Sequence, residues 1–158
     1  MRAALALLLV LLLASPAAGQ RQEQWWSLAV VLHTAMPACT LSQPIRLRPN
    51  VSVQASSDAL EMRAWWGPFR AGREGRWDGR AEVDSRSWRL VGHLDLIGLT
   101  LTVPEAAAPQ LLEALRTGRR LRIFADRHGL VAEADLRGIA DLFPAFQDCL
   151  AQLRGTRL

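Results

Sequence analysis

The sequence predicts an α+β fold, in which an antiparallel β-sheet or sandwich is combined with two C-terminal helices that flank a β-hairpin. Three observations support this fold class. Several runs before residue 104 have apolar residues at every second position, the period of a strand with one buried face. Residues 108–153 contain two stretches of helical period separated by two short alternating runs. The chain has two cysteines, Cys39 and Cys149, which favours one disulfide. The number of runs predicts about six to eight strands.

Residues 1–19 have the pattern of a signal peptide. Arg2 supplies the positive start, Ala3–Ala14 is uniformly apolar, and Ala17 and Gly19 place small residues before a cleavage point. The alternative is a retained membrane anchor, but the apolar run is shorter than the roughly 20 residues that span a bilayer. We therefore expect a periplasmic or secreted protein whose residues 20–158 form a single domain.

The first strands are expected between residues 25 and 66. Residues 25–32 are apolar and strand-like, residues 45–48 alternate between two prolines as in an edge strand, and residues 51–53 continue extended. In the next run Leu60, Met62, Ala64 and Trp66 alternate with Glu61, Arg63 and Trp65. This alternation places Trp65 and Trp66 on opposite faces of a strand.

Two further alternating runs follow a stretch without a clear pattern. Residues 70–80 are rich in glycine and charge, so we expect a loop or a long hairpin with no core of its own. Residues 88–96 and 99–103 alternate again and are expected to be strands, with Gly98 as a bend between them.

A short helix is expected before Gly118. Its apolar stripe has helical spacing and consists of Ala108, Leu111, Leu112 and Leu115. Pro109 suits the first turn, where its missing N–H is not needed. We expect Gly118 to end the helix in the left-handed conformation.

A β-hairpin is expected over residues 120–136, with a turn at residues 126–129. A four-residue loop pairs Ala125 with Leu130, and this register satisfies both faces of the hairpin at once. The remaining expected pairs are Ile123 with Ala132, Leu121 with Ala134, Arg122 with Glu133, and Arg120 with Asp135.

The last element is expected to be a second helix. After Gly138, its stripe consists of Ile139, Leu142, Phe143, Phe146, Leu150 and Leu153. Because proline is tolerated only in a first turn, Pro144 predicts that regular helix begins near Asp141, a good N-cap.

The two cysteines are expected to pair. A Cys39–Cys149 disulfide would join the start of the domain to its last helix and is worth about 4–5 kcal/mol in the chain-entropy model. The alternative is two buried free thiols, and a redox role lacks a Cys-x-x-Cys motif.

Composition and motifs offer little for catalysis. The net charge is +4, all basic residues are arginines, and nucleic-acid binding does not follow from so small a charge. There is no G-x-S-x-G elbow, no glycine-rich phosphate loop and no pair of carboxylates at a catalytic spacing. We therefore predict no enzyme and no cofactor.

The histidines do not predict a metal site. His33, His93 and His128 are far apart in sequence, with no helical i, i+4 spacing and no cysteine at ligand intervals. The simpler interpretation places His128 in a solvated hairpin turn and His93 on an exposed strand face.

One stretch is a candidate binding surface. It is rich in tryptophan and arginine, and its residues are Trp65, Phe69, Arg70, Arg73, Arg76 and Trp77. An exposed tryptophan beside arginines can stack on a sugar ring or anchor a partner protein. The alternative is that Trp65 covers a second core layer and the arginines form a solvated rim, which is the more common use of large aromatics.

Several segments resemble exported proteobacterial proteins of the invasion-associated protein B type. These segments are the Trp25-Trp26 pair, the run Cys39–Gln43, the run Gly98–Val103, and the tail with Leu112, Leu115 and Gly118 followed by Leu136 and Gly138. The resemblance covers about half of the expected domain. It implies a β-rich periplasmic or secreted domain without an assigned enzymatic activity, and no functional residue is carried over.

The sequence thus predicts an exported, non-enzymatic interaction domain. The alternative is a module that binds a small ligand or a glycan through the tryptophan- and arginine-rich stretch.

Overall fold

The computed structural model describes residues 25–32, 36–44, 49–65, 75–94, 98–126 and 128–155. Within them, nine strands form one antiparallel sheet with the order β1-β2-β3-β4-β7-β6-β5-β8-β9. The strands are β1 (Ser27–Val31), β2 (Ala38–Ser42), β3 (Asn50–Ser56), β4 (Leu60–Trp65), β5 (Gly75–Val83), β6 (Arg86–Leu94), β7 (Gly98–Val103), β8 (Arg120–Ala125) and β9 (Gly129–Asp135). The helices are a short 3₁₀ turn η1 (Glu105–Ala107), α1 (Ala108–Thr117) and α2 (Ile139–Gly155). An antiparallel sheet with two helices is therefore correct, but the expected six to eight strands were too few.

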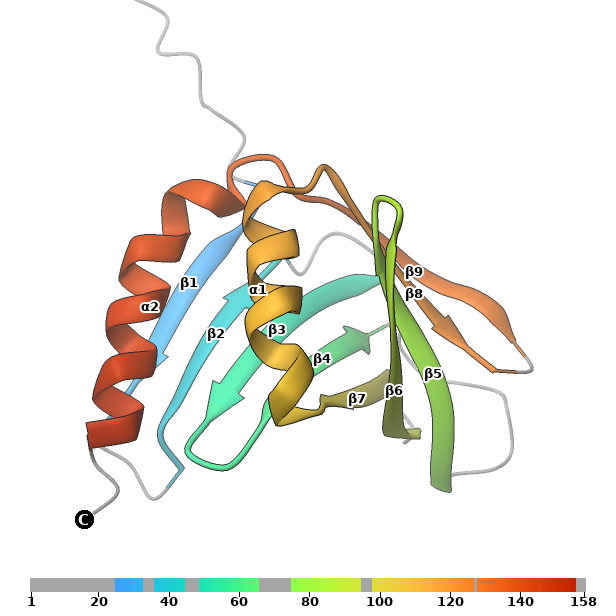
Figure 1. Ribbon diagram of the computed structural model, residues 1–158, viewed down its shortest axis with the longest axis horizontal. Coiled ribbons are helices and arrows are strands. Elements are labelled where there is room, and N and C mark those ends of the chain that lie inside the picture. The colour runs from blue at the N-terminus through green and yellow to red at the C-terminus, as the bar shows by residue number, and fades with distance from the viewer. Residues whose placement is uncertain are drawn as a thin grey trace, which may run out of the picture.

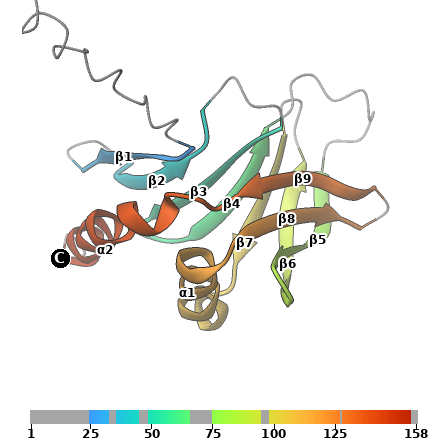
Figure 2. The ribbon, with the colours of Figure 1, turned by 90° about the horizontal axis from the view of Figure 1, so that it is seen from above.

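The sheet is curled into a half-barrel, and both helices lie on its concave side (Figure 1). Figure 2 shows this side from above, with α1 facing the middle of the sheet and α2 lying beside β1 and β2. The indole Nε1 of Trp26, just before β1, donates a hydrogen bond of 2.7 Å to the carbonyl oxygen of Asp135 at the end of β9. The curl thus brings the beginning of the sheet to its end.

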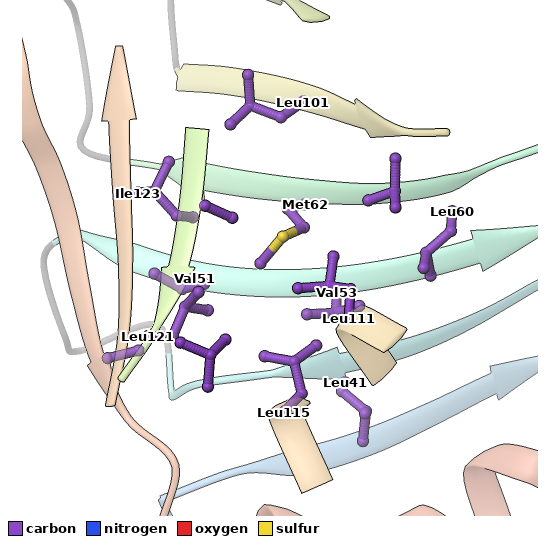
Figure 3. Close-up of a cluster of buried hydrophobic side chains, with 14 of the residues drawn as sticks. Leu41, Val51, Val53, Leu60, Met62, Leu101, Leu111, Leu115, Leu121 and Ile123 are labelled. Carbon is purple, nitrogen blue, oxygen red and sulfur yellow. The ribbon is translucent and has the colours of Figure 1, made fainter. Parts of the chain in front are cut away.

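The core fills the concave side. Every second residue of the strands points inward, and Figure 3 shows Leu111 and Leu115 of α1 lying against the layer that includes Val53 and Met62. From α2 the buried side chains are Ile139, Phe143, Phe146, Cys149 and Leu153. Burial of these side chains supplies the main driving force for closing the helices on the sheet.

Glycines allow the strong bend between β7, β6 and β5. A Cβ at Gly92 of β6 would overlap the carbonyl oxygen of Thr100 in the neighbouring strand β7. A Cβ at Gly79 of β5 would lie 2.6 Å from the carbonyl oxygen of Phe124 in β8. Glycine in a strand permits this close approach of backbones at a corner.

The strand β5 corrects part of the expectation for residues 70–80. Residues 75–80 are not a loop but belong to a long hairpin of β5 and β6, the second expected form. From Gly79 onwards β5 also pairs with β8, so it contributes to the core of the sheet. Its buried residues Gly79, Ala81 and Val83 are small, so the apolar alternation is weak in the sequence. The strand joins β6 through a tight turn at Asp84, which has a φ of 53°.

Helix α1 has the expected stripe, with Leu111, Ala114 and Leu115 buried and Pro109 in the first turn. The role expected for Gly118 was wrong, because it has φ −80° and ψ 173°, an extended conformation. A Cβ there would overlap the side chain of Val83 and lie 2.6 Å from the carbonyl oxygen of Ala114. Glycine is therefore needed for close packing of the chain on β5 and not for a left-handed turn.

Helix α2 begins at Ile139, two residues before the expected start at Asp141, which lies in its first turn. Gly138, with a φ of 77°, makes the turn that leads into it. Pro144 is the sixth residue of the helix, so the prediction that it must lie in the first turn was wrong.

Strands β8 and β9 pair with Leu121 opposite Ala134 and Ile123 opposite Ala132, the register expected from the sequence. The outer pairs Arg120 with Asp135 and Arg122 with Glu133 are also present. The turn end differs, because a bulge between Ile123 and Phe124 places Leu130 opposite Phe124 and not opposite Ala125.

Cys39 of β2 and Cys149 of α2 form a disulfide, with their Cα atoms 6.1 Å apart, as the sequence predicts. Several other expectations concern segments outside the described residues, namely the signal peptide at 1–19, the edge strand at 45–48 and the placement of Trp66. Among the described helices, none has both the length and the apolarity to cross a bilayer.

Candidate functional site

The structure places the predicted binding residues on two different faces of the sheet. Trp65 lies on the outer, convex face with Glu61 and Arg63, and its side chain is 38% exposed. Arg76 lies on the same outer face and is exposed. Phe69, Arg70 and Arg73 are outside the described residues.

Trp77 points to the opposite face. It pairs with Gly92, which pairs with the buried Leu101, so Trp77 is on the concave side. The indole is half-buried and contacts the ring of His128, with the ring centroids 4.8 Å apart and the planes tilted by 34°. Arg76 and Trp77 are consecutive residues of β5 and therefore face opposite sides of the sheet. Because Trp65 lies on the same face as Arg76, Trp65 and Trp77 do not belong to one continuous surface.

The surroundings of Trp65 are polar. Across the sheet it lies between Asn50 of β3 and Gly98 of β7, which has no side chain to cover the indole. Two positions earlier, Arg63 forms an ion pair of 2.7 Å with Glu61, and the buried Nε of Arg63 has no hydrogen-bond partner. The cross-strand neighbours of Arg63 on this face are, in order, Thr100 of β7, His93 of β6 and Arg76 of β5. This Trp65 surface thus combines one flat aromatic ring with hydrogen-bond donors.

The two edges of the sheet form a second kind of candidate surface. Among the described residues, β1 pairs only with β2, and β9 pairs only with β8. Both edge strands therefore present backbone N–H and C=O groups that can pair with another strand.

The β1 edge has no feature that prevents such pairing. Its sequence from Ser27 to Val31 contains no charge and no proline, and its register with β2 is regular. Val30 pairs directly with the buried Cys39, so it lies on the concave face, yet its side chain is 48% exposed. Among the described residues, the apolar layer of the sheet therefore reaches β1, where Leu28 is partly buried and Val30 is left half-exposed.

The β9 edge carries features that prevent pairing with another strand. Glu133 and Asp135 place charges on it, and they form ion pairs with Arg120 at 3.8 Å and Arg137 at 2.8 Å. The bulge at Ile123 and Phe124 interrupts the pairing of this hairpin. Charges and bulges are the usual means of blocking association through an edge strand.

A cleft lies between α1 and α2. It consists of two adjoining hollows of about 670 and 720 Å³ that share Ala108, Leu112 and Leu150 in their lining, together with Glu105 and Arg154 at the rim. Neither lining contains histidine or cysteine among the described residues. The cleft offers apolar contact, charges and the hydroxyl groups of Ser56 and Ser57.

No catalytic or metal-binding arrangement is found in the described part of the chain. Within it, no group of three His, Cys, Asp or Glu side chains is placed to hold a metal ion. His93 is exposed on the outer face, His128 lies in the hairpin turn, and His33 is outside the described residues.

The clearest change in pKa is at the surface of α1. The hydrogen bond from Arg116 lowers the pKa of Glu113, and the same contact raises the pKa of Arg116. Both side chains are exposed members of a helical i, i+3 pair, so this change reflects a surface ion pair and not a reactive site.

Comparison of the chain with protein-family models, with curated proteins and with solved structures gives no match. The assignment of a function therefore rests on the surfaces described above. The sequence alone located Trp65, but it could not identify the β1 edge, since an apolar run predicts a strand without showing how many neighbours the strand has.

Proposed function

We propose that this protein is an exported, non-enzymatic interaction domain that binds an extended polypeptide segment by adding it as a strand to β1. Export is supported by the signal-like pattern of residues 1–19. Strand addition is a common recognition mode in which backbone hydrogen bonds supply affinity and alternate side chains supply specificity.

The observation that carries the proposal is the half-exposed Val30. It lies on the face that is core elsewhere in the sheet, beside a disulfide-linked strand. A strand added to β1 would cover it with an apolar side chain and pair the outer backbone groups of Ser27–Val31. At about 25 cal/mol per Å² of apolar surface, burying Val30 favours an occupant with apolar residues at alternate positions.

The test measures binding of a labelled peptide to dilute protein by fluorescence anisotropy. The peptide alternates valine with threonine between terminal lysines, and a second peptide has prolines in place of its central valines. We expect the first peptide to bind and the proline peptide not to bind. The Val30→Lys variant should lose binding by about tenfold or more, because an inward-pointing charge blocks strand pairing.

Leu130→Lys is the matched control, because Leu130 is 52% exposed on the other edge strand. It should leave peptide binding unchanged. Equal binding of both peptides, or equal loss in both variants, would contradict strand addition at β1.

A second candidate function is binding of a small ligand or a glycan at the Trp65 surface. The specific observation in its favour is the exposed indole of Trp65 on the same face as the exposed side chains of His93 and Arg76. Soluble peptidoglycan fragments are suitable probes in isothermal titration. Trp65→Ala should abolish the binding heat without lowering the thermal midpoint, while Val91→Ala on the same face should bind normally. Absence of heat with the unmodified protein would remove this candidate.

We also propose membership of the invasion-associated protein B type and a closing role for the C-terminal unit. The shared segments around Cys39, Gly98 and Leu112 support the first. The order α1, β8, β9, α2 and the burial of Leu111 and Phe146 support the second, in which two helices flanking a hairpin close the sheet.

A further inference from the structure

We infer that the strand added to β1 is β1 of a second copy of this chain, paired antiparallel about a two-fold axis at Ala29. This inference rests on the proposed function, since it names the occupant of the same edge. The result is one sheet that continues from β9 of one copy to β9 of the other.

The register follows from symmetry. Two identical antiparallel strands related by a two-fold axis at Ala29 place Ala29 opposite itself, Leu28 opposite Val30 and Ser27 opposite Val31. This register uses all five residues of β1. In an antiparallel pair, two residues that face each other are either hydrogen-bonded or not hydrogen-bonded to each other. Ala29 can face its own copy in both cases, so the register does not depend on which residues of β1 direct their backbone groups away from β2.

The side chains of β1 suit this register on both faces. Leu28 and Val30 lie on the concave face, as their pairing with Leu41 and Cys39 shows. In the symmetric pair, these two residues of each copy form one unbroken apolar row, so the exposed Val30 is covered by Leu28 of the second copy. On the outer face lie only Ser27, Ala29 and Val31, and no like charges oppose each other.

The contrast with β9 indicates that two copies would pair through β1 and not through β9. The same symmetric pairing at β9, with its axis at Ala132, would place Glu133 of one copy diagonally next to Glu133 of the other on one face. Like charges on paired strands are destabilising, so of the two edges only β1 is suited to pair with itself.

A five-residue strand provides a small interface. Interfaces below about 1,200 Å² belong to weak or transient complexes, so we expect dissociation constants on the order of micromolar. Dimerisation should therefore depend on concentration.

The first experiment is sedimentation of the mature, oxidised protein from about 1 to about 100 μM. We expect a monomer–dimer equilibrium whose dissociation constant rises by about tenfold or more in Val30→Lys and stays unchanged in Leu130→Lys. If Val30→Lys also lowers the thermal midpoint, the measurement is made with Val30→Thr instead, because threonine keeps the β-branched shape.

The second experiment tests the register by cross-linking. The native cysteines are already joined, so a new cysteine at an exposed position reports on the contact between copies. Ala29→Cys should form a disulfide-linked dimer under mild oxidation, because the two new thiols face each other. Ser27→Cys should not, because it faces Val31, and the double variant Ser27→Cys/Val31→Cys should cross-link again.

The outcomes separate this inference from the proposed function. A monomer at all concentrations, with peptide binding retained, would overturn the second copy and leave strand addition standing. A monomer that binds no peptide would overturn both. Cross-linking of Ser27→Cys as efficient as that of Ala29→Cys would overturn the two-fold register.

Discussion

The two edge strands of this sheet meet the same physical problem in different ways. β1 is short, uncharged and regular, and it lies beside β2, which a disulfide fastens to α2. β9 belongs to a bulged hairpin with acidic residues on its outer face. Both strands expose backbone groups, but only β9 carries side chains that prevent their use. This difference supports the proposal that a further strand pairs with β1 and not with β9.

The edges are also joined to each other. The hydrogen bond from Trp26 to the carbonyl oxygen of Asp135 links the residue before β1 to the last residue of β9. This contact needs the sheet to curl, and the curl needs glycine at the bends. Four features therefore test the difference between the edges. They are the disulfide, the bend at Gly92, the hydrogen bond of Trp26 and the charge of Glu133.

Removal of the disulfide should have the largest effect. The double variant Cys39→Ser/Cys149→Ser should lose about 4–5 kcal/mol of unfolding free energy, because the bond closes a long loop. Chemical denaturation measures the loss. Hydrogen exchange should show that β1 and β2 lose protection more than β8 and β9 do. An equal loss at both edges would contradict the idea that the disulfide fastens the β1 side.

A methyl group at the bend should cost less. Gly92→Ala should destabilise the fold by about 2–3 kcal/mol, because the new Cβ overlaps the carbonyl oxygen of Thr100. Gly155→Ala is the control, since a Cβ there meets nothing within 4 Å. Its unfolding free energy should stay within about 0.5 kcal/mol of the original. Equal stability of the two variants would show that the bend does not require glycine.

Loss of the link between the edges should cost about 1–2 kcal/mol. Trp26→Phe keeps an aromatic ring but leaves the carbonyl oxygen of Asp135 without its donor. Thermal denaturation with hydrogen exchange at residues near both ends of the sheet measures the effect. Trp25→Phe is the control, because the partly buried ring of Trp25 packs on the edge of the core and lies 5.0 Å from the guanidinium of Arg137. A larger loss in Trp25→Phe would refute the link.

Neutralising the β9 edge should change stability least. Glu133→Thr removes an exposed ion pair with Arg120, which is worth less than about 1 kcal/mol. It should nevertheless increase association between copies, because it removes a charge that blocks edge pairing. Sedimentation measures the association. Glu113→Thr on α1 makes the same chemical change away from the edges and should not increase it.

The sequence was informative where the pattern is local. Alternation over residues 120–135 was sufficient for the register of the base of the hairpin, because apolar and charged pairs agree only in that alignment. The stripe of α1 was predicted for a similar reason, whereas the pairing of the two cysteines was predicted from their even number. At the turn the prediction missed the bulge, which depends on backbone geometry and not on side-chain type.

The sequence was uninformative where small residues replace large ones. β5 was not recognised as a central strand because its inward positions include Gly79 and Ala81, which give almost no apolar signal. The role of Gly118 was misjudged for a related reason. A glycine required by a close neighbour looks the same in sequence as one required by a left-handed turn.

The sequence by itself determined which residues share a face in the strands with a clear alternation, where the two helices lie and which cysteines join. These features follow from periods of two and 3.6 residues and from an even thiol count. Only the tertiary structure decided the strand order, the curl, the separation of Trp65 from Trp77 and the position of β1 at an edge of the described sheet. Those properties depend on which backbones approach each other across long stretches of chain, and a local period contains no information about its distant neighbours.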